Sequence, residues 1–144
     1  MNIAHVLARK GVKVFTIGPD QSIRQAVAAL AQHNVGALVV VEEGGRPVGI
    51  LSERDVVRAA ARSEDVFARR VSELMTRDVI VGVPEDDLKS AGTTMTERRI
   101  RHLPVVEKGR LVGIVSIGDV VKALRDQYEG EVVTLQTQVM EGQP

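Results

Sequence analysis

The chain has 144 residues, a formal net charge of +0 and a mean hydropathy of +0.01, which fit a folded protein with a hydrophobic core and exclude a disordered one. Its 19 basic and 19 acidic residues and its 2% aromatic content argue against nucleic-acid binding, which needs a basic face or stacking platforms. Apolar runs such as residues 37–41 are too short to span a bilayer. Because the N-terminus also lacks a basic segment followed by a long apolar one, we expect a cytoplasmic protein without membrane contact.

No residue pattern in the sequence is typical of a catalytic or metal site. The chain has no cysteine, and its three histidines are scattered, so no metal-ligand spacing occurs. A phosphate-binding loop, a GxGxxG sequence and a nucleophile with an activating base are also missing from the sequence. We therefore expect no catalytic residue, no metal ligand and no enzymatic activity.

The sequence contains an internal duplication. Residues 14–44 match residues 79–109 at an offset of 65, and after one extra turn residue, Gly45, the match continues at an offset of 64. Roughly a third of about 46 aligned positions are identical, which is more than two unrelated amphipathic segments would share. The chain is therefore built from two copies of one structural unit.

Each copy predicts the same order of elements: strand, helix, strand, strand, helix. The helices show apolar residues at helical spacing, and the paired strands are rich in valine and leucine and are joined by glycine-containing turns. The predicted elements are a strand near 14–16, a helix over 22–33, strands over 37–41 and 48–51 and a helix over 53–61, then a strand near 79–81, a helix from about 88, strands over 103–106 and 111–115 and a helix over 118–127. The fold class is a mixed α/β (α+β) fold.

The chain divides into five segments. They are a helical lead-in over residues 1–13, motif 1 over 14–62, a helix-prone linker over 63–78, motif 2 over 79–127 and a C-terminal arm over 128–144. The arm carries apolar residues among polar ones. Two interpretations of it remain open: a helical or extended arm that covers a partner subunit, or a solvated, frayed end.

In each copy the third strand ends at a serine that is followed three residues later by an aspartate. The pairs are Ser52 with Asp55 and Ser116 with Asp119. One interpretation is structural, because this spacing at a helix start is that of a capping box. The other is functional: the carboxylate accepts hydrogen bonds from both ribose hydroxyls of a nucleotide, and the serine, with the helix N-terminus, binds a phosphate. The two are partly compatible, because a capping serine still has a hydroxyl proton to donate.

This pattern resembles a pair of CBS domains, a so-called Bateman module, of the stand-alone bacterial type. The resemblance rests on residues 49–55 and 113–119, with support from 101–106 and 71–76, and it covers about residues 3–125. It implies two motifs packed about a pseudo-twofold axis, with two clefts that bind AMP, ADP or ATP and, in some members, NAD(H) or S-adenosylmethionine. It also implies a homodimer, usually a flat disc of four motifs.

Arg101 and His102 precede the strand over 103–106 in the second copy. They fit either a solvated helix C-terminus or, as the resemblance implies, a phosphate site, which suits a guanidinium. The matching residues of the first copy, Gly36 and Ala37, carry no charge, although Arg54 offers one nearby. We therefore expect the second-copy site to be the better anion binder.

In this interpretation Arg101 and His102 act with Ser116 and Asp119, so Asp119→Ala should weaken binding more than Asp55→Ala. Adenine is expected among apolar and main-chain groups. The complete set of expected ligand-binding residues is Thr16, Ile17, Gly36, Ala37, Ser52, Arg54, Asp55, Ile80, Val81, Arg101, His102, Pro104, Ser116 and Asp119.

The sequence thus predicts a non-enzymatic regulatory module that binds adenine nucleotides and signals through a dimer surface to a downstream protein whose identity the sequence does not give. Two alternatives remain: a constitutive scaffold with empty clefts, or an S-adenosylmethionine binder.

Overall fold

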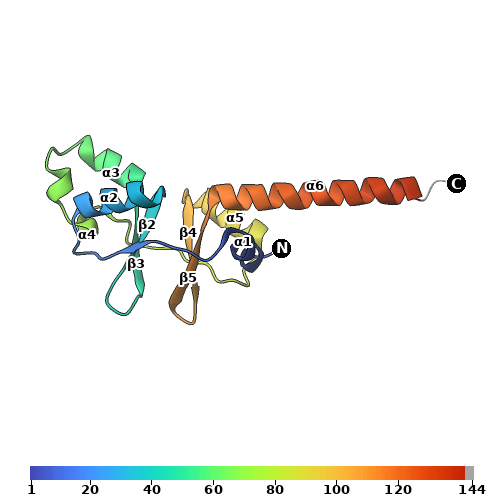
Figure 1. Cartoon of the computed structure of the whole chain (residues 1–144), viewed down its shortest axis with the longest axis horizontal. Helices are drawn as coiled ribbons and strands as arrows, with labels where there is room; N and C mark the ends of the chain where they lie inside the picture. The colour runs from blue at the N-terminus through green and yellow to red at the C-terminus, as the bar shows by residue number, and fades with distance from the viewer. Residues whose placement is uncertain (142–144) are drawn as a thin grey trace.

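The computed structural model describes the backbone of residues 1–141 and the side chains of residues 1–138. Two motifs lie side by side, and one long helix projects from the second (Figure 1). Motif 1 consists of β1 (Thr16–Ile17), α2 (Ile23–His33), β2 (Ala37–Val41), β3 (Pro47–Ser52) and α3 (Glu53–Ala60). Motif 2 consists of α5 (Leu88–Glu97), β4 (His102–Glu107), β5 (Arg110–Ser116) and α6 (Ile117–Glu141). The predicted mixed α/β fold is confirmed.

The two small sheets differ at the strand that opens each motif. In motif 1, β1 pairs parallel to β2, and β2 pairs antiparallel to β3. In motif 2, β4 and β5 are antiparallel, but the strand predicted near 79–81 is wrong: the parallel pairing is a single bridge between Gly82 and Val105. The second pairing is missing because Pro104 has no N–H: at the equivalent position of motif 1, the Val39 N–H donates to the Phe15 carbonyl over 3.2 Å.

Side-chain caps fix where the helices begin. Ser22 and Ser52 form capping boxes at the starts of α2 and α3, and Asp87 caps α5 by accepting from the Ser90 N–H. At the C-terminus α6 does not end near residue 127 as predicted but continues as one helix to Glu141. The arm is therefore helical up to that residue, and residues 142–144 lie outside the described part of the chain.

Each motif is completed by a helical segment that lies outside its own copy of the repeat. α1 (Ile3–Lys10) precedes motif 1 in the chain but packs into the core of motif 2, where Ile3 is fully buried. The linker, with η1 (Val66–Ala68) and α4 (Val71–Leu74), packs into the core of motif 1. Two interleaved cores result, and the chain crosses between the motifs twice.

No helix within residues 1–141 is both long enough and apolar enough to cross a membrane.

Candidate functional site

A cleft of about 650 Å³ lies where the two motifs meet. Three segments line it: the start of α3 with Ser52–Asp55, residues 76–80 at the end of the linker, and residues 99–102 in the turn between α5 and β4. Because its walls come from both motifs, we call it the inter-motif cleft. Its lining carries four arginines and three carboxylates, so it offers groups for both a phosphate and a hydroxyl-bearing ligand.

Ser52 and Asp55 hold the start of α3 against this cleft. The Asp55 N–H donates to Ser52 Oγ over 3.2 Å, and the Ser52 N–H donates to Asp55 Oδ2 over 2.9 Å. This is the predicted capping box, and it fixes the carboxylate at the cleft wall. Among the residues whose side chains are described, Asp55 forms no ion pair, so its charge is available to a ligand.

The equivalent pair in motif 2 has the same backbone geometry but a different electrostatic state. Ser116 and Asp119 form the same two hydrogen bonds, over 3.1 and 2.8 Å. In addition, Lys10 Nζ of α1 lies 2.5 Å from Asp119 Oδ2. Burial alone would raise the pKa of Asp119, but hydrogen bonds from Lys10 and Ser116 together hold it below its usual value. Lys10 is therefore already paired with Asp119, the carboxylate that we expected from the sequence to belong to the better anion-binding site.

Arg101 and His102 line the inter-motif cleft together with Ser52 and Asp55, whereas Asp119 is not part of the lining of this cleft. His102 is opposite Ser116 in the β4–β5 register, yet the turn that precedes β4 faces motif 1. A Cβ atom placed on Gly36 of motif 1 would lie 3.9 Å from His102 Cε1, which shows how closely the two motifs approach. Arg101 and His102 lie next to motif 1 because of the way the two copies pack together. The sequence pattern within one copy does not predict that packing.

Burial is the main cause that lowers the pKa of His102, and the positive charge of Lys10 lowers it further. The carboxylates of Asp119 and Glu53 act in the opposite direction without reversing the shift. His102 is consequently neutral at pH 7, and it offers a hydrogen bond to a ligand rather than a full charge.

The structure distributes the expected ligand-binding residues over several places. Those that line the inter-motif cleft are Gly36, Ser52, Arg54, Asp55, Ile80, Arg101 and His102. Those that line a second pocket are Thr16 and Ile17. Those that line neither are Ala37, Val81, Pro104, Ser116 and Asp119.

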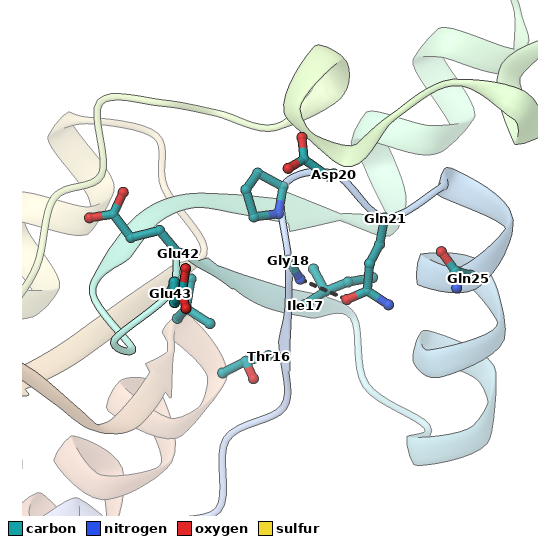
Figure 2. Close-up of a pocket in the computed structure, with 10 residues that line it drawn as sticks. Thr16, Ile17, Gly18, Asp20, Gln21, Gln25, Glu42 and Glu43 are labelled. Carbon is teal, nitrogen blue, oxygen red and sulfur yellow. Dashed lines mark hydrogen bonds between the residues drawn. The ribbon is translucent and has the colours of Figure 1, made fainter.

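The second pocket, of about 520 Å³, lies on motif 1 between β1, the start of α2 and the β2–β3 turn (Figure 2). The Gly18 N–H donates to Gln21 Oε1 over 2.8 Å and closes one side of it. Its lining includes the carboxylates of Asp20, Glu42 and Glu43 but no lysine or arginine. This charge is unfavourable for a phosphate, so the pocket is a poor match for a nucleotide.

Two cationic residues of the cleft, Arg58 and Arg99, were not among the expected ligand residues. Arg58 is three residues after Asp55, so helical spacing places both on one face of α3, and that spacing was the available signal. Arg99 has a φ of 56°, in the left-handed region, and Asn34 occupies the equivalent position of motif 1 with a φ of 51°. Asparagine tolerates this conformation better than arginine. The presence of an arginine at this strained position therefore indicates that Arg99 is a functional residue. No group of three metal-ligating side chains occurs in the described part of the chain.

Comparison with known proteins agrees with the duplicated architecture. A family model described as "CBS domain" matches residues 5–62 and 71–126. The CBS domain-containing protein YhcV of Bacillus subtilis is 38% identical over 124 residues, which are 85% of this chain and 87% of that protein. The crystal structure of a CBS-domain-containing protein from Agrobacterium tumefaciens is 43% identical with a TM-score of 0.81, and the match covers 85% of this chain and 98% of that one. The CBS domain pair of protein MJ0100, solved with 5-methylthioadenosine and S-adenosyl-L-methionine, is 27% identical with a TM-score of 0.78, covering 88% of this chain and 98% of that one.

Proposed function

The chain belongs to the CBS-domain family, and from this premise we propose that it is a regulatory module that binds an adenine-containing nucleotide in the inter-motif cleft. The observation that carries the proposal is the presence in one cleft of an unpaired carboxylate, a hydroxyl at a helix start and several arginines. Each has a counterpart in a nucleotide: a ribose diol, a phosphate and the spread negative charge of a phosphate chain.

In the proposed complex Asp55 accepts hydrogen bonds from the ribose hydroxyls. Ser52 Oγ and the N-terminus of α3 bind a phosphate, with Arg101 as the charged partner. Adenine packs against Ile80, which is half-buried in the same cleft. This arrangement reverses the order of the two sites expected from the sequence, because Asp119 is neutralised by Lys10 whereas Asp55 is not.

Four arginines favour AMP, ADP or ATP over S-adenosylmethionine, whose sulfonium centre is cationic. The three carboxylates of the lining, and the ligands present with protein MJ0100, keep S-adenosylmethionine as the second candidate. NAD(H), which contains an adenosine with a diphosphate, is the third. The proposal assigns no catalytic step to the chain.

A ligand in this cleft would contact both motifs at once and thereby stabilise one relative orientation of them. A downstream protein that binds one orientation better than the other would then bind more or less tightly when the nucleotide is present, and this coupling is the proposed regulation. Signalling through a homodimer, and the flat disc of four motifs, remain part of this proposal.

The test is calorimetric titration of the whole chain with AMP, ATP, NADH and S-adenosylmethionine, repeated with Asp55→Asn and, as the matched control, Asp119→Asn. We expect Asp55→Asn to weaken nucleotide binding at least tenfold and the control to change it less than threefold. Failure of all four ligands to bind at millimolar concentration would sink the proposal and favour the scaffold with empty clefts. Equal effects of the two substitutions would contradict the assignment of the site to the inter-motif cleft.

A further inference from the structure

Four arginines line the inter-motif cleft without a carboxylate partner. Arg54 and Arg58 come from α3 of motif 1, and Arg99 and Arg101 come from the turn before β4 of motif 2. All four are exposed, and none of them forms an ion pair within residues 1–138, although three carboxylates line the same cleft. Guanidinium groups that share a cleft in this state repel one another and attract a polyvalent anion.

Arg58 extends the positive charge of the motif 1 wall along α3. It follows Arg54 by four residues, so the two lie on one side of the helix, about 6 Å apart along its axis. Because helical side chains lean toward the helix N-terminus, the Arg58 side chain covers the turn that contains Asp55. Like charges at this spacing slightly destabilise a helix, so this arginine pair does not serve the stability of α3.

Arg99 supplies the matching charge on the motif 2 wall. It follows the end of α5 with a φ of 56°, and its N–H donates to the Thr96 carbonyl over 3.2 Å. Asn34 follows α2 in the same way, with a φ of 51° and a bond of 3.3 Å to the Ala31 carbonyl. Since asparagine makes the same turn and tolerates its conformation better, the turn itself does not require a cation.

The proposed nucleotide site uses Arg101 and the N-terminus of α3 for one phosphate and assigns no ligand group to Arg58 or Arg99. A monophosphate bound there would leave both guanidinium groups unpaired, whereas each additional phosphate brings charge and acceptor oxygens that suit them. We propose, on the basis of the proposed function, that Arg58 and Arg99 bind the second and third phosphates from opposite walls. The cleft then selects a nucleoside triphosphate over a monophosphate.

Calorimetric titration of the whole chain with AMP and ATP tests this selectivity, in a buffer with EDTA so that the free nucleotides are compared. We expect ATP to bind at least tenfold more tightly than AMP. Arg58→Gln and Arg99→Asn should each weaken ATP binding at least threefold and AMP binding less than twofold. The variant with both substitutions should bind the two nucleotides with affinities within threefold of each other.

Matched controls are Arg62→Gln and Arg98→Asn, which remove the same charge from exposed neighbours that do not line the cleft. They should leave the ratio of ATP to AMP affinity unchanged within twofold. If they lower it as much as the cleft variants do, general attraction by the positive charge of the chain explains the preference, and the assignment to Arg58 and Arg99 is overturned.

Inorganic tripolyphosphate separates phosphate selectivity from nucleotide binding, because it has the phosphate chain without ribose or adenine. It should bind more tightly than inorganic phosphate, and Arg58→Gln should weaken it at least threefold. Equal affinities for AMP and ATP, or equal losses of both in Arg58→Gln, would overturn the selectivity and leave the proposed nucleotide site standing. Binding of tripolyphosphate but of neither nucleotide would instead contradict the proposed function and keep both arginines as ligands of a phosphate chain.

Discussion

The ionisation of His102 should respond in opposite directions to the removal of two neighbouring charges. Lys10 lowers the pKa of this histidine, after burial, whereas Asp119 raises it. Lys10→Met keeps most of the side-chain stem but removes the charge, so it should raise the pKa of His102 toward its usual value. Asp119→Asn keeps an oxygen to accept from the Ser116 N–H, and it should lower the pKa of His102 further.

The same substitutions should reveal the energy of the Lys10–Asp119 pair. The two side chains are 30% and 27% exposed, and their hydrogen bond is charge-assisted at 2.5 Å. Ion pairs on the surface contribute little to stability, and this pair should contribute more because it is partly buried. We therefore expect Lys10→Met to lower the free energy of unfolding by about 1–2 kcal/mol at neutral pH. A double-mutant cycle with Asp119→Asn should return a coupling energy of about 1 kcal/mol.

The pH dependence follows from the signs of the two shifts. Both groups have a lower pKa in the folded than in the unfolded chain, so the unfolded chain binds more protons and stability rises with pH across each window. The contribution of Asp119 is complete above about pH 3.8 and is lost as the pH falls through its lower folded value. The contribution of neutral His102 is complete above about pH 6.5 and is lost below that.

Nuclear magnetic resonance titration of His102 measures the pKa changes, and urea unfolding between pH 3 and pH 8 measures the stabilities. Shifts of the same sign in Lys10→Met and Asp119→Asn would refute the electrostatic reasoning. A loss of stability in Lys10→Met that persists unchanged below pH 3 would show that packing of the lysine stem, rather than its charge, is responsible.

Three further substitutions test the backbone and the cores. Arg99→Asn should raise the free energy of unfolding by up to about 1 kcal/mol in urea, because asparagine tolerates the left-handed conformation, and should weaken nucleotide binding; a destabilised variant would contradict this. Gly113→Ala should destabilise by about 1–3 kcal/mol, since the new Cβ would lie 2.8 Å from Leu7 Cδ2, and Leu7→Ala should relieve part of that loss. Ile3→Ala should cost about 2–5 kcal/mol and reduce amide protection in β4 and β5 more than in β2 and β3, whereas equal reduction would argue against separate cores.

The parts of the fold that depend on local sequence were predictable. The serine and aspartate of each repeat lie three residues apart and cap their own helix, so the geometry of Ser52 with Asp55 follows from the spacing alone. The order of strands and helices likewise follows from apolar periodicity within each copy. The exception is the opening strand of motif 2, where Gly82 forms only one bridge, because Pro104 lacks the N–H that Val39 donates at the equivalent position of motif 1.

The site itself was predicted only in its parts. Arg101 was recognised as a cation near a helix–strand turn, but its partners come from the other copy, and no repeat alignment shows which face of one copy meets the other. Lys10 and Asp119 are 109 residues apart, and their contact exists because α1 packs on the motif it does not precede. The helical lead-in over residues 1–13 was predicted, but the motif against which it packs is set by the tertiary structure.

Because α1 packs on motif 2 and not on the motif that follows it in the chain, the charged groups of α1 are fixed relative to motif 2. α1 belongs to the core of motif 2, so Lys10 and Asp119 move with that motif as one body. His102 lies at the boundary, where it senses this pair on its own motif and Glu53 on motif 1. If a nucleotide changes the relative orientation of the motifs, the Glu53 contribution changes while the Lys10 and Asp119 contributions stay fixed. A ligand-dependent change in the pKa of His102 that persists in Lys10→Met would therefore have two sources, motion between the motifs and direct contact with the ligand. Glu53→Gln separates them, because it removes the contribution that depends on the motion and leaves the effect of ligand contact.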